Sequence, residues 1–187
     1  MIILEGPDSS GKTTLAHALS ETLGIPVHHF GGPPESAAEL RERIDFMFDN
    51  KDFLIYDRIP LISEQVFSIL RRQNYMNVLT NSNADHVRLQ ELKPILIYCR
   101  PSDELLMACN HQVSEHDTED HIKAVEAHKK ALLERYDHVM GSDLMPRYWK
   151  YDYTKMNVGG LITRVESTIK ERNHYPQFHL GKRDNDQ

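Results

Sequence analysis

The sequence has few cysteines and no long hydrophobic segment. Only Cys99 and Cys109 occur in its 187 residues, and they form no Cys-x-x-Cys pair, so we expect neither a disulfide framework nor a thiol-rich metal site. No apolar run approaches the roughly 20 residues that span a membrane. The first residues run from Met1 directly into Gly6 and Pro7, which is not the pattern of a signal peptide. These absences predict a protein of the reducing cytoplasm that does not enter a membrane.

Positive charge is also scarce. The net charge is −6, which argues against a surface built to hold long nucleic acid. Residues 102–134 contain no arginine, and their only lysines are Lys123, Lys129 and Lys130. Eleven histidines are present, but those between 111 and 121 are spaced five residues apart, which does not gather them on one helix face. We therefore expect no histidine metal centre.

Short apolar runs alternate with segments of helical periodicity along the chain. The runs are apolar on both faces, as in parallel strands that are covered by helices on both sides. We predict strands at 2–4, 27–30, 53–56, 95–99 and 148–153, and helices at 13–23, 35–48, 62–73, 117–139 and 158–172. This order predicts one α/β domain, residues 1–173, with an open parallel sheet of about five strands in a three-layer arrangement, and a polar tail at 174–187. Ligands are expected at the carboxyl ends of the strands.

One segment matches a phosphate-binding motif in full. Residues 6–13 fit the pattern G-x-x-x-x-G-K-[ST] and stand between an apolar run and a helical segment. The glycines let the backbone turn so that successive N–H groups face phosphate oxygens, and the following helix adds the positive end of its dipole. Lys12 is expected to contact the β- and γ-phosphates of ATP, and the Thr13 hydroxyl to bind Mg²⁺. The ATP-binding residues predicted from this motif are Gly6, Pro7, Asp8, Ser9, Ser10, Gly11, Lys12, Thr13 and Thr14.

An acidic and a basic residue follow the third apolar run. Asp57 ends a buried strand, where a carboxylate can hold Mg²⁺ beside the phosphate loop, directly or through water. Arg58 stands next to it as a bidentate phosphate ligand. We therefore predict a phosphotransferase in which Lys12, Asp57 and Arg58 are catalytic, with Thr13 and Asp57 at the metal.

Asp8 in the third position of the loop, together with Asp57-Arg58, resembles the thymidylate kinase family of nucleoside monophosphate kinases. That family's loop reads G-x-[DE]-G-x-G-K-[ST], and the likeness covers residues 1–70 of this chain. The resemblance implies that Asp8 contacts the 3′-hydroxyl of the acceptor's sugar, and that Asp57 and Arg58 serve the metal and the acceptor phosphate. Ser63 falls where the family places a serine after that pair.

The sequence also departs from this family. Thymidylate kinases carry Thr-Arg-Glu-Pro-Gly-Gly after the second strand, whereas residues 29–34 here read His-Phe-Gly-Gly-Pro-Pro and supply no arginine for an acceptor phosphate. Ile59 replaces the aromatic residue that follows the Asp-Arg pair. The segments His-Phe-Gly-Gly-Pro-Pro at 29–34 and Tyr-Cys-Arg-Pro at 98–101 are similar to phage-encoded members of the superfamily, which work in the host cytoplasm. Some of those phosphorylate deoxynucleoside monophosphates, and others, the 5-hydroxymethyluridine DNA kinases, phosphorylate a hydroxymethyl group on a base in DNA.

Further residues are predicted around the two substrates. Arg100 follows the fourth strand, where related kinases place a residue near ATP. Residues 102–120 are predicted to form a mobile lid that closes over the phosphates. The predicted acceptor site comprises Asp8, Phe30, Arg58, Ser63, Arg71 and Arg72, with Phe67 and Tyr75 as further candidates for stacking on a base.

The acceptor is left open between hypotheses. The first is a free pyrimidine deoxynucleoside monophosphate, whose phosphate needs no general base. The second is the hydroxymethyl group of 5-hydroxymethyluridine in phage DNA, which must lose a proton to Asp57 or Asp8 and requires a base flipped out of the helix. A third is a P-loop ATPase or regulator without an acceptor. The acidic net charge favours the first, the missing arginine favours the second, and the sequence leaves open whether the protein forms a homodimer.

Overall fold

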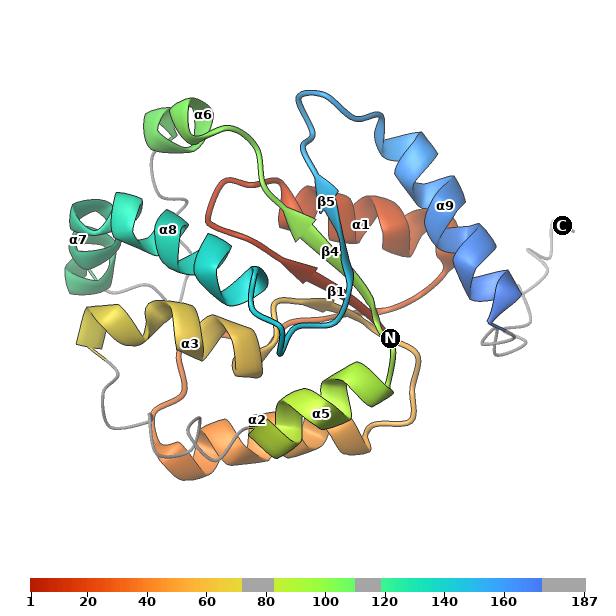
Figure 1. Cartoon of the computed structure of the whole chain (residues 1–187), viewed down its shortest axis with the longest axis horizontal. Helices are drawn as coiled ribbons and strands as arrows, with labels where there is room; N and C mark the ends of the chain where they lie inside the picture. Colours follow the sequence, from red (N-terminus) through yellow and green to blue (C-terminus); the bar gives the residue numbers. More distant parts are fainter. Residues whose placement is uncertain (72–82, 110–118, 173–187) are drawn as a thin grey trace, which may run out of the picture.

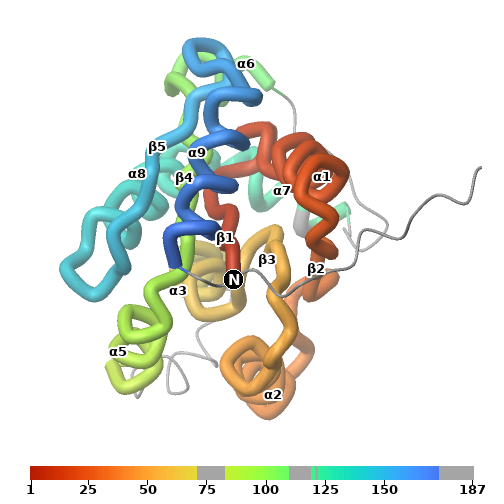
Figure 2. The backbone as a smooth tube through the Cα atoms, turned by 90° about the vertical axis from the view of Figure 1, so that its right-hand side faces the viewer, coloured from red at the N-terminus to blue at the C-terminus, as the bar shows by residue number. Residues whose placement is uncertain are grey.

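A parallel sheet forms the centre of the structure, a computed structural model that describes residues 1–71, 83–109 and 119–172 (Figure 1). Within these residues, five parallel strands lie in the order β2-β3-β1-β4-β5, and Figure 2 shows them side by side in that order. The strands are β1 (Ile2–Glu5), β2 (Val27–His28), β3 (Ile55–Asp57), β4 (Ile95–Cys99) and β5 (Tyr148–Tyr151). The predicted open parallel sheet is therefore confirmed.

Strand β1 lies at the middle of the sheet, where the direction of winding changes. From β1 the chain passes to β2 and β3 on one side, and later to β4 and β5 on the other. Ile3 is paired with Tyr56 of β3 and with Leu96 of β4, so both edges of β1 are covered. Connections that leave β1 in opposite directions open a crevice at its carboxyl end, which is where ligands bind in sheets of this kind.

Alternate side chains of the strands supply two hydrophobic cores, one on each face of the sheet. Ile2 and Leu4 belong to the core under α1 (Lys12–Leu23) and α9 (Val158–Glu171). Ile3 belongs to the core under α2 (Ala37–Asp49), α3 (Pro60–Arg71), α5 (Asn83–Glu91) and α8 (Lys129–Met140). Because strand side chains alternate between faces, each short apolar strand anchors both helical layers. The predicted three-layer arrangement is confirmed.

Two helices lie where the sequence predicted none. Helix α5 buries Asp85 and His86 as well as Leu89, so its inward face is not an apolar stripe. Asp85 is satisfied by an ion pair with Arg41 of α2, with 2.6 Å between Arg41 Nη1 and Asp85 Oδ2. A buried carboxylate that depends on a residue 44 positions away leaves no periodic signal in the sequence. The second is α6 (Asp103–Ala108), whose six residues are too few to show a period.

The predicted helix at 117–139 is wrong as one element. Its described part consists of α7 (Glu119–Ala127) and α8, separated at His128. The His128 backbone has φ −111° and ψ 13°, and its Nδ1 lies 2.9 Å from the carbonyl oxygen of Ala124. This local hydrogen bond competes with continuation of the helix. The two helices share one polar composition, so the break is invisible in the periodicity.

The described residues contain neither a membrane-spanning helix nor a cluster of metal ligands. No helix among them is long and apolar enough to cross a bilayer. No three His, Cys, Asp or Glu side chains among them are grouped so as to hold a metal ion. The predicted tail, 174–187, lies outside the described residues.

Candidate active site

The phosphate loop turns sharply at the carboxyl end of β1, where the sequence predicted it. Gly6, Ser9 and Gly11 have φ angles of 148°, 60° and 82°. A Cβ atom at Gly6 would lie 2.2 Å from the carbonyl oxygen of Cys99, so only glycine fits against β4. Ser9 is strained in this conformation, and such strain gathers at functional sites. The loop is thus held in one shape between β1 and the start of α1.

Lys12 is buried and folded back onto its own loop. Its Nζ donates to the carbonyl oxygen of Pro7 over 2.6 Å and lies 3.3 Å from Ser10 Oγ. Burial, together with the nearby charge of Arg58, lowers the pKa of Lys12 to about 8. A polyphosphate would offer this ammonium stronger, anionic acceptors than a neutral carbonyl. The loop therefore carries an under-neutralised cation at the place where the motif predicts phosphate.

Thr13 and Asp57 meet beside the loop. Thr13 Oγ1 donates to Asp57 Oδ2 over 2.8 Å, although 44 residues separate them in sequence. The Asp57 side chain is almost fully buried, and His29 Nδ1 lies 3.6 Å from the same carboxylate oxygen. A hydroxyl and a carboxylate are ligands that suit Mg²⁺, which takes its other ligands from water and substrate phosphates. The residues present fit the predicted metal.

A strained turn carries Arg58 into the site. Arg58 has a φ of 71°, and its N–H donates to the carbonyl oxygen of Leu4 over 2.9 Å. Glu5 Oε1 accepts from the Ile59 N–H over 2.8 Å, so the last residue of β1 fixes the turn after β3. Glu5 is fully buried, and this burial raises its pKa to about 7. Glu5 was not among the residues predicted from the sequence, although an acidic residue that ends a fully buried strand was a visible signal.

Asp8 and Arg58, both predicted to bind the acceptor, form an ion pair. Arg58 Nη2 donates to the carboxylate of Asp8 and lies 3.4 Å from the carbonyl oxygen of Gly6. The guanidinium carbon lies 5.3 Å from the centre of the Phe67 ring, within the range of a cation–π contact. Arg58 Nε is buried and has no hydrogen-bond partner among the described residues. The Nε hydrogen of Arg58 is therefore not used by the ion pair with Asp8.

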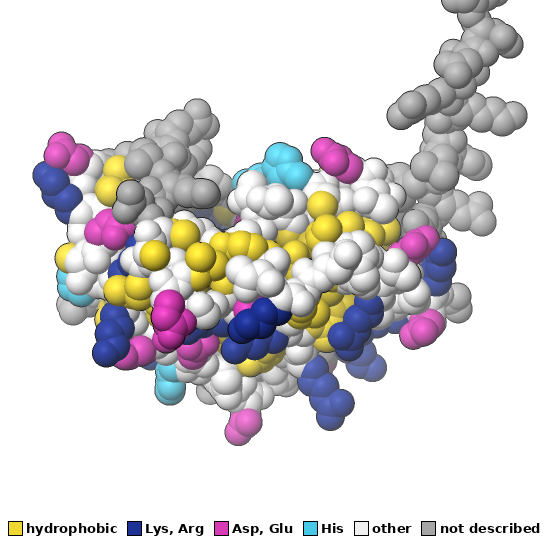
Figure 3. All heavy atoms as spheres, turned by 90° about the horizontal axis from the view of Figure 1, so that it is seen from above, with side chains coloured by type: hydrophobic (Ala, Val, Ile, Leu, Met, Phe, Trp, Pro, Cys, Tyr) yellow, Lys and Arg dark blue, Asp and Glu magenta, His cyan; other side chains and the backbone are white. Residues whose placement is uncertain are grey.

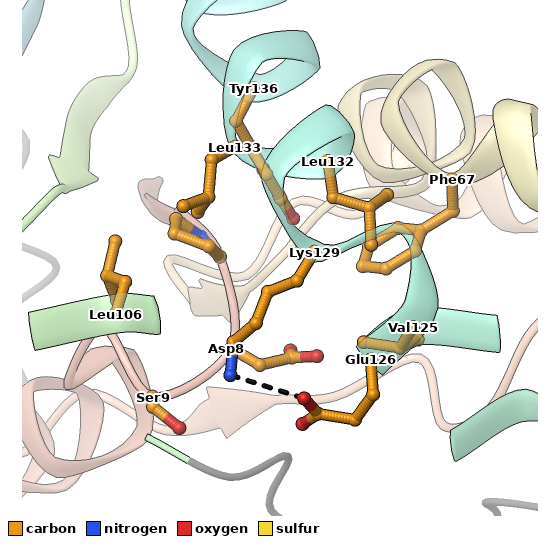
Figure 4. Close-up of a pocket in the computed structure, with 11 residues that line it drawn as sticks. Asp8, Ser9, Phe67, Leu106, Val125, Glu126, Lys129, Leu132, Leu133 and Tyr136 are labelled. Carbon is orange, nitrogen blue, oxygen red and sulfur yellow. Dashed lines mark hydrogen bonds and ion pairs between the residues drawn. The ribbon is translucent and has the colours of Figure 1, made fainter. Parts of the chain in front are cut away.

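A pocket opens beside this pair, between the loop and α8 (Figure 4). It holds about 380 Å³ of space, part of it open to solvent. The loop forms one wall and mostly apolar side chains of α3, α6, α7 and α8 form the others; the lining residues are Pro7, Asp8, Ser9, Phe67, Leu106, Val125, Glu126, Lys129, Leu132, Leu133 and Tyr136. The buried Tyr136 hydroxyl has no partner among the described residues, and burial raises its pKa. An apolar pocket with a few polar groups is the usual form of a small-molecule site.

Lys129 is the only basic residue among those that line the pocket. Its Nζ donates to the carbonyl oxygen of Cys109 and lies 3.5 Å from Glu126 Oε2. Figure 4 shows the side chain reaching from α8 toward Asp8 and Ser9. The sequence singled out Lys129 only as one of three lysines in an arginine-poor segment, because spacing alone could not separate it from its exposed neighbour Lys130.

Phe30 and Arg100 are among the predicted site residues that do not line the pocket. Phe30 packs on Tyr56 with 5.8 Å between ring centres, and it is not among the lining residues. Strand β2 ends at His28 rather than at the predicted residue 30, so Phe30 lies beyond the strand. The guanidinium of Arg100 is held by Asp137 of α8, with Nη2 2.8 Å from Oδ2, and by Asp103 of α6. These carboxylates, not the loop, are its partners in this structure.

The remaining predicted residues are only partly described. Ser63 lies in the first turn of α3 beside Tyr136, and its buried Oγ has no hydrogen-bond partner among the described residues. Arg71 ends α3, whereas Arg72 and Tyr75 lie outside the described residues. Of the predicted lid, residues 110–118 lie outside them as well. The roles assigned to these residues stay predictions.

Solved structures share this fold, and three of them match nearly the whole chain. The YorR protein from Bacillus subtilis, in complex with phosphorylated GDP, has a TM-score of 0.67 and 19% identity over 93% of this chain and 98% of that one. Deoxyadenosine kinase from M. mycoides, with dCMP and dCDP bound, has a TM-score of 0.57 and 17% identity over 91% and 98%. Thymidylate kinase from Candida albicans has a TM-score of 0.57 and 16% identity over 93% and 92%. No model of a known protein family matches the sequence. The chain adopts the fold of P-loop kinases.

Proposed function

We propose that this chain is a kinase that transfers the γ-phosphoryl group of ATP to the phosphate of a pyrimidine deoxynucleoside monophosphate. The observation that carries the proposal is the junction of a phosphate loop with a second, mostly apolar pocket, joined by the Arg58–Asp8 pair. A simple ATPase needs the loop but not the pocket. The fold likeness to deoxyadenosine kinase and thymidylate kinase supports a nucleotide as the occupant.

The donor half binds and orients a triphosphate. Lys12 exchanges the Pro7 carbonyl for phosphate oxygens, which suits an ammonium whose pKa is lowered by burial. Thr13 and Asp57 would hold Mg²⁺, which when bound neutralises charge on the phosphates. Buried groups in fixed positions stabilise developing charge better than water can, since they need not reorganise.

The acceptor half presents both apolar and polar groups. Phe67 and the leucines of α8 offer an apolar slot for a base, and Asp8 can accept a hydrogen bond from a sugar hydroxyl. The ammonium of Lys129 lines the pocket and is a donor for an acceptor phosphate, and the guanidinium of Arg58, paired with Asp8, adds positive charge beside it. Such an acceptor is already an anion, so positioning beside the donor is sufficient and no general base is needed.

A second candidate function is transfer to a hydroxyl group, as in 5-hydroxymethyluridine within DNA. The observation that favours it is Glu5, a buried carboxyl with a pKa of about 7 and with Oε2 unpartnered among the described residues. A carboxyl with such a pKa can take a proton near neutral pH. The net charge of −6 weighs against a DNA substrate.

The decisive experiment offers γ-labelled ATP to the full chain with one acceptor at a time. The acceptors are the four free deoxynucleoside monophosphates, normal DNA and DNA that contains 5-hydroxymethyluracil, and the Lys12→Ala protein is the control. Label on dTMP or dCMP supports the proposal, whereas label only on modified DNA replaces it by the second candidate. If labelled phosphate is released at the same rate with every acceptor and no acceptor becomes labelled, the protein is an ATPase.

A further inference from the structure

Arg100 lies just beyond the end of β4 and is almost completely buried. Its exposed fraction is 7%, and its backbone N–H donates to the carbonyl oxygen of Tyr151 in β5 over 2.7 Å. The sheet therefore fixes the backbone of this residue. From this point the guanidinium reaches α6 and α8, two of the helices that line the pocket.

Every nitrogen of this guanidinium has a partner. Nε and Nη2 donate to the two carboxylate oxygens of Asp137 on α8, over 3.0 and 2.8 Å. Nη2 also donates to Asp103 at the start of α6, and Nη1 donates to the carbonyl oxygen of Pro101 over 2.9 Å. The Tyr98 hydroxyl donates to Asp137 Oδ1 over 2.8 Å. Because a bidentate pair of arginine and carboxylate fixes orientation as well as distance, Asp137 is held in one place.

The position of Asp137 determines the position of the pocket-lining side chains of α8. Lys129, Leu133 and Asp137 are spaced four residues apart, so they follow one another on the same face of the helix. Lys129 and Leu133 line the pocket, and so does Tyr136, the neighbour of Asp137 (Figure 4). A rotation or shift of α8 that broke its pair with Arg100 would therefore also displace these side chains.

Helix α6 is tied to the same arginine. Of its six residues only Leu106 is buried, and the Leu106 side chain lines the pocket. Met107 is 48% exposed, and Figure 3, which views the molecule from the end where α6 lies, shows a band of hydrophobic side chains open to solvent. So short a helix with one buried side chain gains little stability from its own hydrogen bonds or from burial. Its ion pair from Asp103 to the buried guanidinium therefore helps to hold it in place.

We propose that Arg100 and Asp137 are positioning residues of the acceptor pocket, which hold α6 and α8 against the sheet so that the pocket walls are preformed. The inference rests on the proposed function, because it takes the pocket to be the acceptor's site. A preformed pocket loses less free energy on binding than one whose walls must first be ordered. Neither residue lines the pocket, so neither needs to touch the acceptor.

The donor half does not use this pair. Lys12 is hydrogen-bonded within its own loop, and Thr13 is hydrogen-bonded to Asp57. Loss of the pair should therefore weaken binding of the acceptor and leave binding of ATP unchanged.

The test is steady-state kinetics of label transfer on the full chain, with ATP and then dTMP or dCMP varied. We expect Arg100→Lys, which keeps the charge but loses the bidentate geometry, and Asp137→Asn each to raise the acceptor's KM roughly tenfold. The KM of ATP should stay within about twofold of the wild-type value, a change too small to reflect a lost contact. Glu134→Gln is the matched control on α8, because its side chain is 69% exposed, and it should behave as the wild type.

A double-mutant cycle tests whether the two residues act through their mutual bond. If they do, the variant that carries both Arg100→Ala and Asp137→Ala should raise the acceptor's KM no more than the more harmful single variant. Full multiplication of the two single effects would overturn the proposal. Tyr98→Phe keeps the ion pair and removes one hydroxyl, so it decides the matter if an alanine variant does not fold; we expect a rise of roughly threefold in the acceptor's KM.

Other results overturn the proposal in distinct ways. A rise in the KM of ATP instead of the acceptor's KM would place Arg100 at the donor, as expected from the sequence. Equal rises in both constants, with a lower midpoint of thermal unfolding, would make the pair a general support of the fold. Unchanged constants would leave the pair without a role in the reaction. If the wild-type protein labels neither dTMP nor dCMP, the proposed function fails, and this inference fails with it.

Discussion

The phosphate loop is one uninterrupted stretch of chain, whereas the pocket beside it is assembled from the loop and four helices. Residues 6–13 bring their own backbone geometry, and Asp57 is added from the next strand in the sheet. Besides the loop residues, the pocket is lined by Phe67 of α3 and by side chains of α6, α7 and α8. A site made from contiguous residues is specified locally, and a site made from several helices is specified only by packing.

The two halves also differ in their electrostatics. In the donor half, Lys12 is buried against neutral oxygens, so its charge is available to an anion. In the acceptor half each cation is already beside a carboxylate, Arg58 with Asp8 and Lys129 with Glu126. Pairs of this kind weaken the attraction for a generic anion and leave selection to shape and geometry. Under the proposed function, the donor half would determine the reaction and the acceptor half the substrate.

The largest effect is expected from Lys12→Ala. Removing this ammonium takes away a donor aimed at the transferring phosphoryl group, and we expect kcat/KM to fall about 10³-fold. The fold should persist, because the hydrogen bonds of the Lys12 ammonium are to Pro7 and Ser10 of its own loop. Label transfer and thermal unfolding are measured together, with the exposed Lys123→Ala on α7 as control. Wild-type activity in Lys12→Ala would remove the loop from the reaction.

The second largest effect on activity is expected from Asp57→Asn. The amide is neutral and holds a divalent cation poorly, so we expect turnover at low Mg²⁺ to fall about 10²-fold. Asp52→Asn changes an exposed acid just before β3 and serves as the control. A Mg²⁺ titration of kcat separates the two variants. An Asp57→Asn curve that matches the Asp52→Asn curve would show that Asp57 is only the end of a strand.

The comparison between the halves also explains what the sequence could predict. The structure brings Thr13 and Asp57 together beside the loop, and a motif of eight residues and one strand end were enough to suggest this arrangement, while the roles of these residues stay predictions. Arg58 and Asp8 were predicted separately, and the structure brings them into contact. Glu5 was missed because its role, fixing the turn at Ile59, depends on the adjacency of β1 and β3.

The acceptor half lay mostly beyond sequence reasoning. Phe30 was expected in the site as an aromatic ring at the end of a predicted strand that could stack on a base, but its ring packs on Tyr56. The break at His128 sets the start of α8, and only then does Lys129 point into the pocket while Lys130 is exposed. Such a difference between neighbours depends on one backbone turn, which periodicity cannot resolve.

A smaller effect on activity is expected from Lys129→Ala, which tests the role of the acceptor half. If Lys129 binds the acceptor phosphate, its loss should raise the acceptor's KM roughly tenfold, as for a hydrogen bond to a charged group, with little change in the KM of ATP. Lys130→Ala, one residue along and 83% exposed at its side chain, is the matched control. Steady-state kinetics with each substrate varied in turn gives both constants. Equal values for the two variants would exclude Lys129 from acceptor binding.

The last prediction concerns stability rather than activity, at Glu5, whose side chain fixes the turn that carries Arg58. Its pKa is about 7 in the folded protein against 4.5 in the unfolded chain, because burial disfavours the carboxylate. The folded state therefore binds the extra proton between these values, and Glu5's contribution to stability is full below pH 4.5 and is lost as the pH rises through about 7. Glu5→Gln keeps an oxygen for the Ile59 N–H but cannot ionise. We expect the two proteins to be similar at pH 5, and the variant to be more stable at pH 8 by on the order of 3 kcal/mol.

Urea unfolding of both proteins at pH 5, 6, 7 and 8 measures this difference, in which groups common to both cancel. Glu21→Gln, an exposed glutamate on α1, should follow the wild type at every pH. Parallel curves for wild type and Glu5→Gln would mean that Lys12 and Arg58 hold Glu5 ionised throughout. In that case the boundary between the halves would be a permanent ion cluster, and Glu5 could not take a proton from a hydroxyl acceptor. A difference that grows with pH would keep Glu5 able to take one, and the labelled-acceptor panel would then decide whether it does so.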